Sequence, residues 1–261
     1  MKNAIILLFI ACTLHHAQAQ IEFELGNTYF AQGVGEMSDL TFVGASTEFG
    51  AKLNNKGFFL GGFYSLGVFQ WRMEQLPMHT NISGYGEDVR VRSRGEIQTM
   101  GLKLRYTQEG FNNKRFFPFG EVGLGHASYR QHWDSKGIRT PFPTGKCPVF
   151  QHHENGRLKL DQTIFALAEI GIMFNYRPKS FIREYNGKGA FFGFSLRYER
   201  GGRVNYADPN AHPEHFYYDS GMGAASDRPF ADVAVATGRT GTKKARHEHL
   251  IYKITLLRLV F

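Results

Sequence analysis

Apolar residues recur at every second position in segment after segment of this chain. The clearest case is residues 190–199, which read AFFGFSLRYE, so that aromatic and aliphatic side chains alternate with small or charged ones. A period of two residues places one class of side chain on each face of a β-strand. The pattern predicts eight strands, at residues 21–30, 41–53, 58–68, 99–107, 117–129, 162–176, 190–199 and 250–261.

Strand length and loop length distinguish a membrane barrel from a soluble sandwich, which also alternates. Most of the predicted strands run about 10–15 residues, and a tilted strand needs about 9–11 to cross a bilayer. The connections 54–57 and 109–114 are short, whereas 72–94, 131–157 and 201–246 are long; two connections, 32–40 and 177–188, break this rule. We therefore predict an all-β fold, an eight-stranded antiparallel transmembrane β-barrel with short periplasmic turns and long extracellular loops.

The amino terminus has the organisation of a secretory signal. A charged start at Lys2 precedes an apolar stretch, and Ala17 and Ala19 are the small residues that a signal peptidase reads. We expect cleavage after Ala19, with residues 20–261 as one barrel domain; an anchor helix or a lipoprotein signal cut before Cys12 are the alternatives. The processed chain then keeps Cys147 as its one thiol, which is free or intermolecular.

The chain ends on Phe261, with Leu257 and Leu259 in the same phase of the last strand. In this respect the sequence resembles the bacterial outer-membrane β-barrels of the small OmpA/OmpX-type or porin-like families. The resemblance implies a place in the outer membrane of a Gram-negative cell, contact with lipids and lipopolysaccharide, and a carboxyl-terminal signal for the barrel-insertion machinery. The last strand departs from the pattern, because both of its phases are apolar apart from Arg258; a β-bulge is one explanation.

The second phase of the strands predicts an ion-paired lumen. Its acids are Glu22, Glu24, Glu48, Glu121, Glu169 and Glu199, and its bases are Lys52, Lys103, Arg105 and Arg197, with Arg258 as a further candidate. Enclosed charges are tolerated only when they are paired. We expect a network that fills an eight-stranded barrel, with lumen glycines making room for the Arg and Lys side chains; a narrow pore for small solutes is the alternative.

One possible catalytic arrangement is His126-Ala127-Ser128. Residues two apart on a strand point the same way, so both side chains would lie on the outer face, where the pair resembles the site of lipid A deacylases. Ser128 would be the nucleophile, His126 the general base and Glu154 the orienting acid. The residue after the serine is Tyr129 and not the asparagine of that family. We expect that the protein is not an enzyme and keep the hydrolase as an alternative.

No cofactor or metal site is predicted. Histidines gather in the long connections (His132, His152, His153, His212 and His215), but their spacing matches no closed coordination pattern. The formal charge of +8 suits anionic lipid head groups, which Arg90, Arg92, Arg94, Lys243, Lys244 and Arg246 would meet. Nucleic acid is not an expected partner, and other protein partners are unknown from the sequence.

These observations predict a structural envelope protein or one that binds through its loops. The connection 201–246 is the best candidate for a binding surface, because it is long and mixes aromatic and charged residues. A narrow porin, the lipid hydrolase and an accessory barrel of a secretion or gliding apparatus are the other functions that the sequence leaves open.

Overall fold

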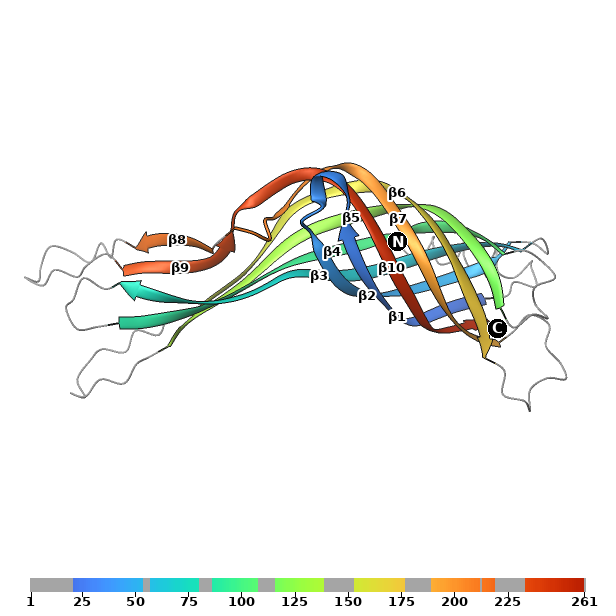
Figure 1. The fold of residues 1–261 in the computed structure, drawn as a ribbon, viewed down its shortest axis with the longest axis horizontal. Coiled ribbons are helices and arrows are strands. Elements are labelled where there is room, and N and C mark those ends of the chain that lie inside the picture. The colour runs from blue at the N-terminus through green and yellow to red at the C-terminus, as the bar shows by residue number, and fades with distance from the viewer. Residues whose placement is uncertain are drawn as a thin grey trace, which may run out of the picture.

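Eight of the strands form a closed ring in the computed structural model (Figure 1). The structure describes residues 21–53, 57–79, 86–107, 116–138, 153–176, 189–211, 213–218 and 233–260; the predicted signal peptide, Cys147 and Phe261 lie outside them. The elements are β1 (Ile21–Gly33), the 3-10 turn η1 (Gly35–Met37), β2 (Thr41–Lys52), β3 (Phe58–His79), β4 (Gly86–Thr107), β5 (Phe116–Ile138), β6 (His153–Tyr176), β7 (Gly189–Ala207), β8 (Pro213–Tyr218), β9 (Val233–Thr240) and β10 (Thr242–Val260).

Neighbouring strands of the ring are antiparallel, in the order β1-β10-β7-β6-β5-β4-β3-β2. The ring closes where β1 pairs with β10, from Glu22 opposite Val260 to Gly33 opposite His249. The predicted eight-stranded antiparallel barrel is therefore confirmed. No described helix is long and apolar enough to cross a membrane.

The outer surface of the ring is apolar on every strand. Leu102, Leu124 and Ile164 are among its most exposed side chains, at 64%, 63% and 72% exposure. Large exposed hydrophobic side chains come from all eight strands, for example Phe23, Phe49, Leu60, Leu104, Val122, Ile170, Phe194 and Ile254. We call this surface the apolar belt. A soluble barrel would bury such residues, so the polarity of this barrel is reversed.

Aromatic side chains share the lumen with the charged ones. A Cβ at Gly125 would lie 2.4 Å from Cζ of Phe165, and one at Gly44 would lie 2.3 Å from the Tyr29 hydroxyl. These lumen glycines seat aromatic rings, so the expectation that they make room for Arg and Lys side chains was wrong at these positions. The glycines were correctly assigned to the lumen phase, but the aromatic rings of that phase were overlooked.

Four strands continue well beyond the belt. The segments 72–94 and 131–157 were expected to be loops, but β3 and β4 pair from Arg72 opposite Ser93 to His79 opposite Gly86. β5 and β6 likewise pair as far as Lys136 opposite His153. Within 201–246, β7 and β10 extend the ring and β8 pairs with β9 as a separate hairpin. Figure 1 shows these strand ends and the hairpin projecting from one end of the barrel; we call them the extension.

The last strand contains the bulge that its two apolar phases suggested. The register of β10 against β7 shifts between Thr255 and Arg258. Leu256 and Leu257 are consequently both exposed, and Arg258 enters the lumen. Leu259 is only partly exposed, and Phe261 lies beyond the described part of the strand.

A side chain added at Gly125 tests the packing of the lumen. We expect Gly125→Ala to lower the free energy of unfolding by about 1–3 kcal/mol, because the new methyl group overlaps Phe165. The control is Gly120→Ala, where a new Cβ would lie 4.0 Å from the carbonyl oxygen of Glu169. Denaturant titration in detergent measures both, and equal stabilities of the two variants would contradict the packing described here.

Candidate functional site

Ten charged side chains form one buried layer across the lumen. They come from β1, β2, β4, β5, β6, β7 and β10, and each is at most 4% exposed; they are Glu22, Glu24, Glu48, Lys103, Arg105, Glu121, Glu169, Arg197, Lys253 and Arg258. We call this set the charged layer. Each residue lies in the lumen phase of its strand. The period of two therefore places charged side chains from strands distant in sequence in the same layer of the lumen.

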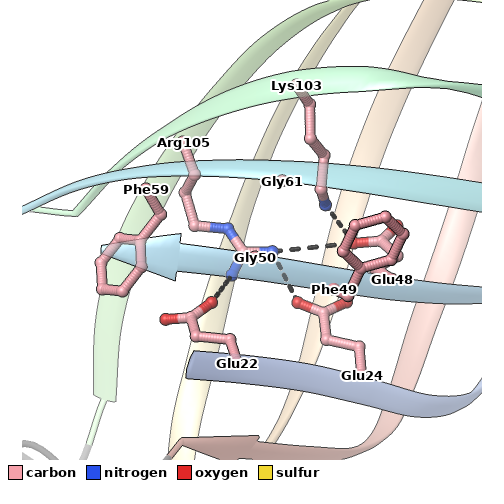
Figure 2. Close-up of a pocket in the computed structure, with 9 residues that line it drawn as sticks. All are labelled: Glu22, Glu24, Glu48, Phe49, Gly50, Phe59, Gly61, Lys103 and Arg105. Atoms are coloured by element: carbon pink, nitrogen blue, oxygen red, sulfur yellow. Dashed lines mark hydrogen bonds and ion pairs between the residues drawn. The ribbon is translucent and has the colours of Figure 1, made fainter. Parts of the chain in front are cut away.

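Arg105 connects the most acids. Its guanidinium lies 2.8 Å from Oε2 of Glu22 and 2.5 Å from Oε1 of Glu24, and its Nε donates to Glu121. Figure 2 shows the guanidinium between the carboxylates of β1 and β2. Because the planar guanidinium has five N–H donors, it can serve several carboxylates at once.

Glu48 is an acid that pairs with several bases, as Arg105 is a base that pairs with several acids. Lys103 donates to its Oε2, while Arg197 Nη2 and Lys253 Nζ lie 2.8 and 2.9 Å from Oε1. Arg197 and Lys253 also pair with Glu169, at 2.6 and 2.7 Å. Each charge therefore has more than one partner of opposite sign, which offsets the cost of removing it from water.

The predicted lumen charges and the observed ones differ at two positions. Lys52 lies in the lumen phase as predicted, but it is partly exposed near the end of β2 and outside the charged layer. Lys253 belongs to the charged layer and was not predicted. In the sequence, Lys253 shares the period-two phase of His249 and Ile251. The apolar residues around Arg258 hid the fact that this phase faces the lumen.

A small pocket borders the charged layer. It is lined by Glu22, Glu24, Glu48, Phe49, Gly50, Phe59, Gly61, Lys103 and Arg105 (Figure 2). Gly50 and Gly61 are opposite each other on β2 and β3, and neither contributes a side chain to the lining. The lining carboxylates are already paired with Arg105 and Lys103, so the pocket presents balanced charges and not an unmatched one.

An apolar plug fills the other part of the lumen. Buried hydrophobic residues from η1 and all eight ring strands form one cluster, which includes Tyr29, Met37, Phe42, Phe69, Ile97, Tyr129, Phe165, Tyr206, Ala245 and Ile251. Phe63 and Phe165 have ring centroids 6.3 Å apart, and Arg197 lies 5.0 Å above the ring of Phe63. The plug thus packs directly on the charged layer.

Three metal-ligating side chains meet beside this plug. Ligand atoms of Glu199, His247 and His249 lie within 4.8 Å of one another, and all three residues are buried. Glu199 was predicted as a lumen ion-pair partner, and its Oε1 is 3.8 Å from Arg197 Nη1. The two histidines were missed, although a His-x-His pair that continues the period of the last strand was visible in the sequence.

The structure does not assemble the possible catalytic triad. The Ser128 hydroxyl is buried and has no hydrogen-bond partner, so His126 does not activate it. His126 is opposite Ile164 on β6, and Glu154 is ten residues away along that strand, which is about 33 Å at the rise of a strand. Glu154 cannot orient His126 at that distance, and this arrangement was wrong.

A group of ion pairs fastens the turn around η1 to the rim. Asp39 Oδ2 lies 2.7 Å from Lys243 Nζ, and Arg203 Nη2 lies 2.9 Å from Glu36. Burial, followed by the charge of Asp39, raises the pKa of Tyr206 to about 12. Tyr206 thus stays protonated and donates to Asp39 at 3.2 Å.

Comparisons with known proteins are sparse. No protein-family model matches the chain, and no curated protein sequence does. Among solved structures, Neisserial surface protein A matches with a TM-score of 0.32 and 10% identity, over 94% of this chain and 98% of that chain. Ail, the attachment invasion locus protein of Yersinia pestis, solved with the heparin analogue sucrose octasulfate, matches with a TM-score of 0.31 and 11% identity, over 92% of this chain and 97% of that chain.

Proposed function

We propose that this chain is an integral outer-membrane β-barrel with a filled lumen, whose role is to present its extension at the cell surface. The observation that carries the proposal is the apolar belt on all eight ring strands around a charged, packed interior. A bilayer is the environment that makes such an exterior favourable, since lipid-facing strands are apolar outward and polar inward. The belt spans about nine residues on β6, from Ile164 to Ile172, close to the strand length needed to cross a bilayer.

The extension is the part that would reach away from the membrane. From Phe69 to His79, β3 continues for ten residues, or about 33 Å at the rise of a strand. The β8–β9 hairpin packs beside it, with β9 contacting β3, β4 and β5. A rigid barrel that holds long strands outside the membrane is suited to binding, because a fixed scaffold lowers the entropic cost of ordering a binding surface.

Lipopolysaccharide is the proposed lipid partner. Exposed bases follow the strand segments just beyond the belt, among them Arg92, Arg94, Arg157, Lys159, Arg200, Arg203, Lys244 and Arg246. Guanidinium and ammonium groups at this level would pair with the phosphates of an anionic leaflet. We likewise propose that Leu257, Leu259 and Phe261 form the carboxyl-terminal signal for the insertion machinery.

Conductance in planar bilayers tests the filled lumen. The purified, detergent-folded protein should give no ohmic steps, because the charged layer and the plug occupy the lumen. A Phe165→Ala, Tyr129→Ala double variant opens space in the plug and serves as the matched comparison. Regular steps from the unaltered protein, changed by Arg105→Met, would instead favour the narrow-porin alternative.

A further inference from the structure

We propose that Glu199, His247 and His249 bind one divalent transition-metal ion inside the barrel. Two imidazoles and one carboxylate form the ligand set used for Zn²⁺ and for Fe²⁺, Co²⁺ or Ni²⁺. Ca²⁺ and Mg²⁺ prefer oxygen ligands and do not suit it. We refer to these three residues as the His-Glu site.

The strand geometry brings the three side chains together without a loop. His247 and His249 are two residues apart on β10, so both enter the lumen. His249 is directly opposite Glu199 on β7. The two imidazole centroids are 4.5 Å apart with the rings at 75°. In a tetrahedral site with bonds of about 2.1 Å, ligand atoms are about 3.4 Å apart. The ligand atoms here lie within 4.8 Å of one another, so approaches of up to about 1.4 Å between pairs would complete the coordination.

Four polar atoms of the site make no hydrogen bond, although His247 Nε2 lies 3.4 Å from Glu199 Oε2 and Glu199 Oε1 lies 3.8 Å from Arg197 Nη1. Neither ring nitrogen of His249 makes a hydrogen bond, and the same holds for Nε2 of His247 and Oε1 of Glu199. His247 and His249 are 0% exposed. An unpartnered polar atom in a buried setting is costly and uncommon. One ion can take one nitrogen from each imidazole and one oxygen from Glu199, so three of these four atoms would gain a shared partner.

The surroundings hold the rings in position. Tyr129 Oη and His247 Nδ1 are 2.7 Å apart. When Nδ1 donates to that hydroxyl, Nε2 carries the free lone pair, as outer hydrogen bonds commonly arrange for metal-bound histidines. Phe165 packs 4.8 Å from the His247 ring, and Phe42 packs 5.1 Å from His249. The site is therefore oriented and apolar around its ligands.

The charge balance of the lumen also leaves room for a cation. The buried lumen acids are Glu22, Glu24, Glu48, Glu121, Glu169 and Glu199, and the buried lumen bases are Lys103, Arg105, Arg197, Lys253 and Arg258. Six acids against five bases leave one carboxylate unmatched within this set. Of these six acids, Glu199 is the one whose nearest base in the set is farthest away, since Arg197 Nη1 lies 3.8 Å from its Oε1. A proton on His247 would balance this charge too, so the experiment must separate a metal from a proton.

Metal binding is measured on the full processed chain. The protein is unfolded in denaturant that contains a chelator, and the chelator is then removed. The protein is refolded in detergent with Co²⁺ or Zn²⁺ and separated from free metal. We expect about one ion per folded chain and visible Co²⁺ absorption bands typical of imidazole coordination. Glu199→Gln and His249→Phe should lose this stoichiometric binding, and Tyr129→Phe should weaken it about 10–100-fold. His126→Ala, which alters a histidine on the outer face, is the control and should bind like the unaltered protein.

Three results would overturn the proposal. The first is a refolded, unaltered protein that retains no metal. The second is binding that persists in His249→Phe. The third is a proton alone, seen as an imidazole titration in nuclear magnetic resonance spectra that added Zn²⁺ does not change. If His249→Phe does not fold, the Co²⁺ spectrum of the unaltered protein and the Tyr129→Phe affinity still decide the question. None of these measurements depends on conductance or on the surface role proposed above.

Discussion

Replacing Arg105 with methionine should lower the free energy of unfolding by about 3–5 kcal/mol, because it removes the shared partner of several buried carboxylates. Glu22, Glu24 and Glu121 all pair with this guanidinium. Methionine keeps much of the side-chain volume and supplies no charge, so the loss reports mainly on uncompensated acids. Denaturant titration in lipid vesicles, followed by tryptophan fluorescence, gives the free energy.

Lys52→Met is the matched control. Like Arg105→Met it removes a base from the lumen phase of a strand, but at a partly exposed position near the end of β2. We expect a change within about 0.5 kcal/mol, as for most surface substitutions. A second comparison is Arg105→Met combined with Glu121→Leu, which should recover part of the loss because one stranded acid is gone. A loss of unfolding free energy below about 1 kcal/mol for Arg105→Met alone would contradict the ion-pair network of the charged layer.

Leu124→Arg should destabilise the barrel in a bilayer by about 2–4 kcal/mol, the cost of an arginine on the lipid face near the midplane. Leu124 is 63% exposed and faces outward beside Leu102. In a water-soluble barrel, the same change at so exposed a position would alter stability by less than about 0.5 kcal/mol. The measurement is the unfolding free energy in lipid vesicles, compared with that of the unaltered chain.

Val43→Arg provides the depth control. Val43 is 61% exposed and lies two residues from the start of β2, near the rim. There the cost should fall to about 0–1 kcal/mol, since arginine reaches the interface. Equal costs at Leu124 and Val43 would mean that the belt does not sit in a bilayer as we propose.

The sequence predicted the ring strands because their outer phase is apolar along the belt. It did not predict the extension, where the apolar face is short: Val89 and Val91 alternate with Arg90 and Arg92, and Ser93 then ends the apolar phase. Backbone hydrogen bonds continue there with only a weak hydrophobic signal. Hydropathy therefore marked the belt and not the ends of the strands.

The candidate site was predictable only in part, for a related reason. The acids and bases on β2 and β4–β7 fell in a clean phase and were assigned to the lumen from the alternation alone. On β10 the bulge between Thr255 and Arg258 reverses the phase, so the inward residues Lys253, His247 and His249 could not be assigned by counting from Phe261. A local change of register is decided by backbone pairing across the ring, which one strand's sequence does not contain.

The charged layer has a consequence for assembly. Arg258 of β10 pairs with Glu22 of β1, and these residues come from opposite ends of the chain, so their contact forms only when the first and last strands meet. Until then, an open sheet would expose ionised groups to acyl chains, which is energetically prohibitive. Seam closure and entry into the bilayer should accordingly be coupled events, and the carboxylates and guanidiniums of the interior would act as a barrier to inserting half-built sheets.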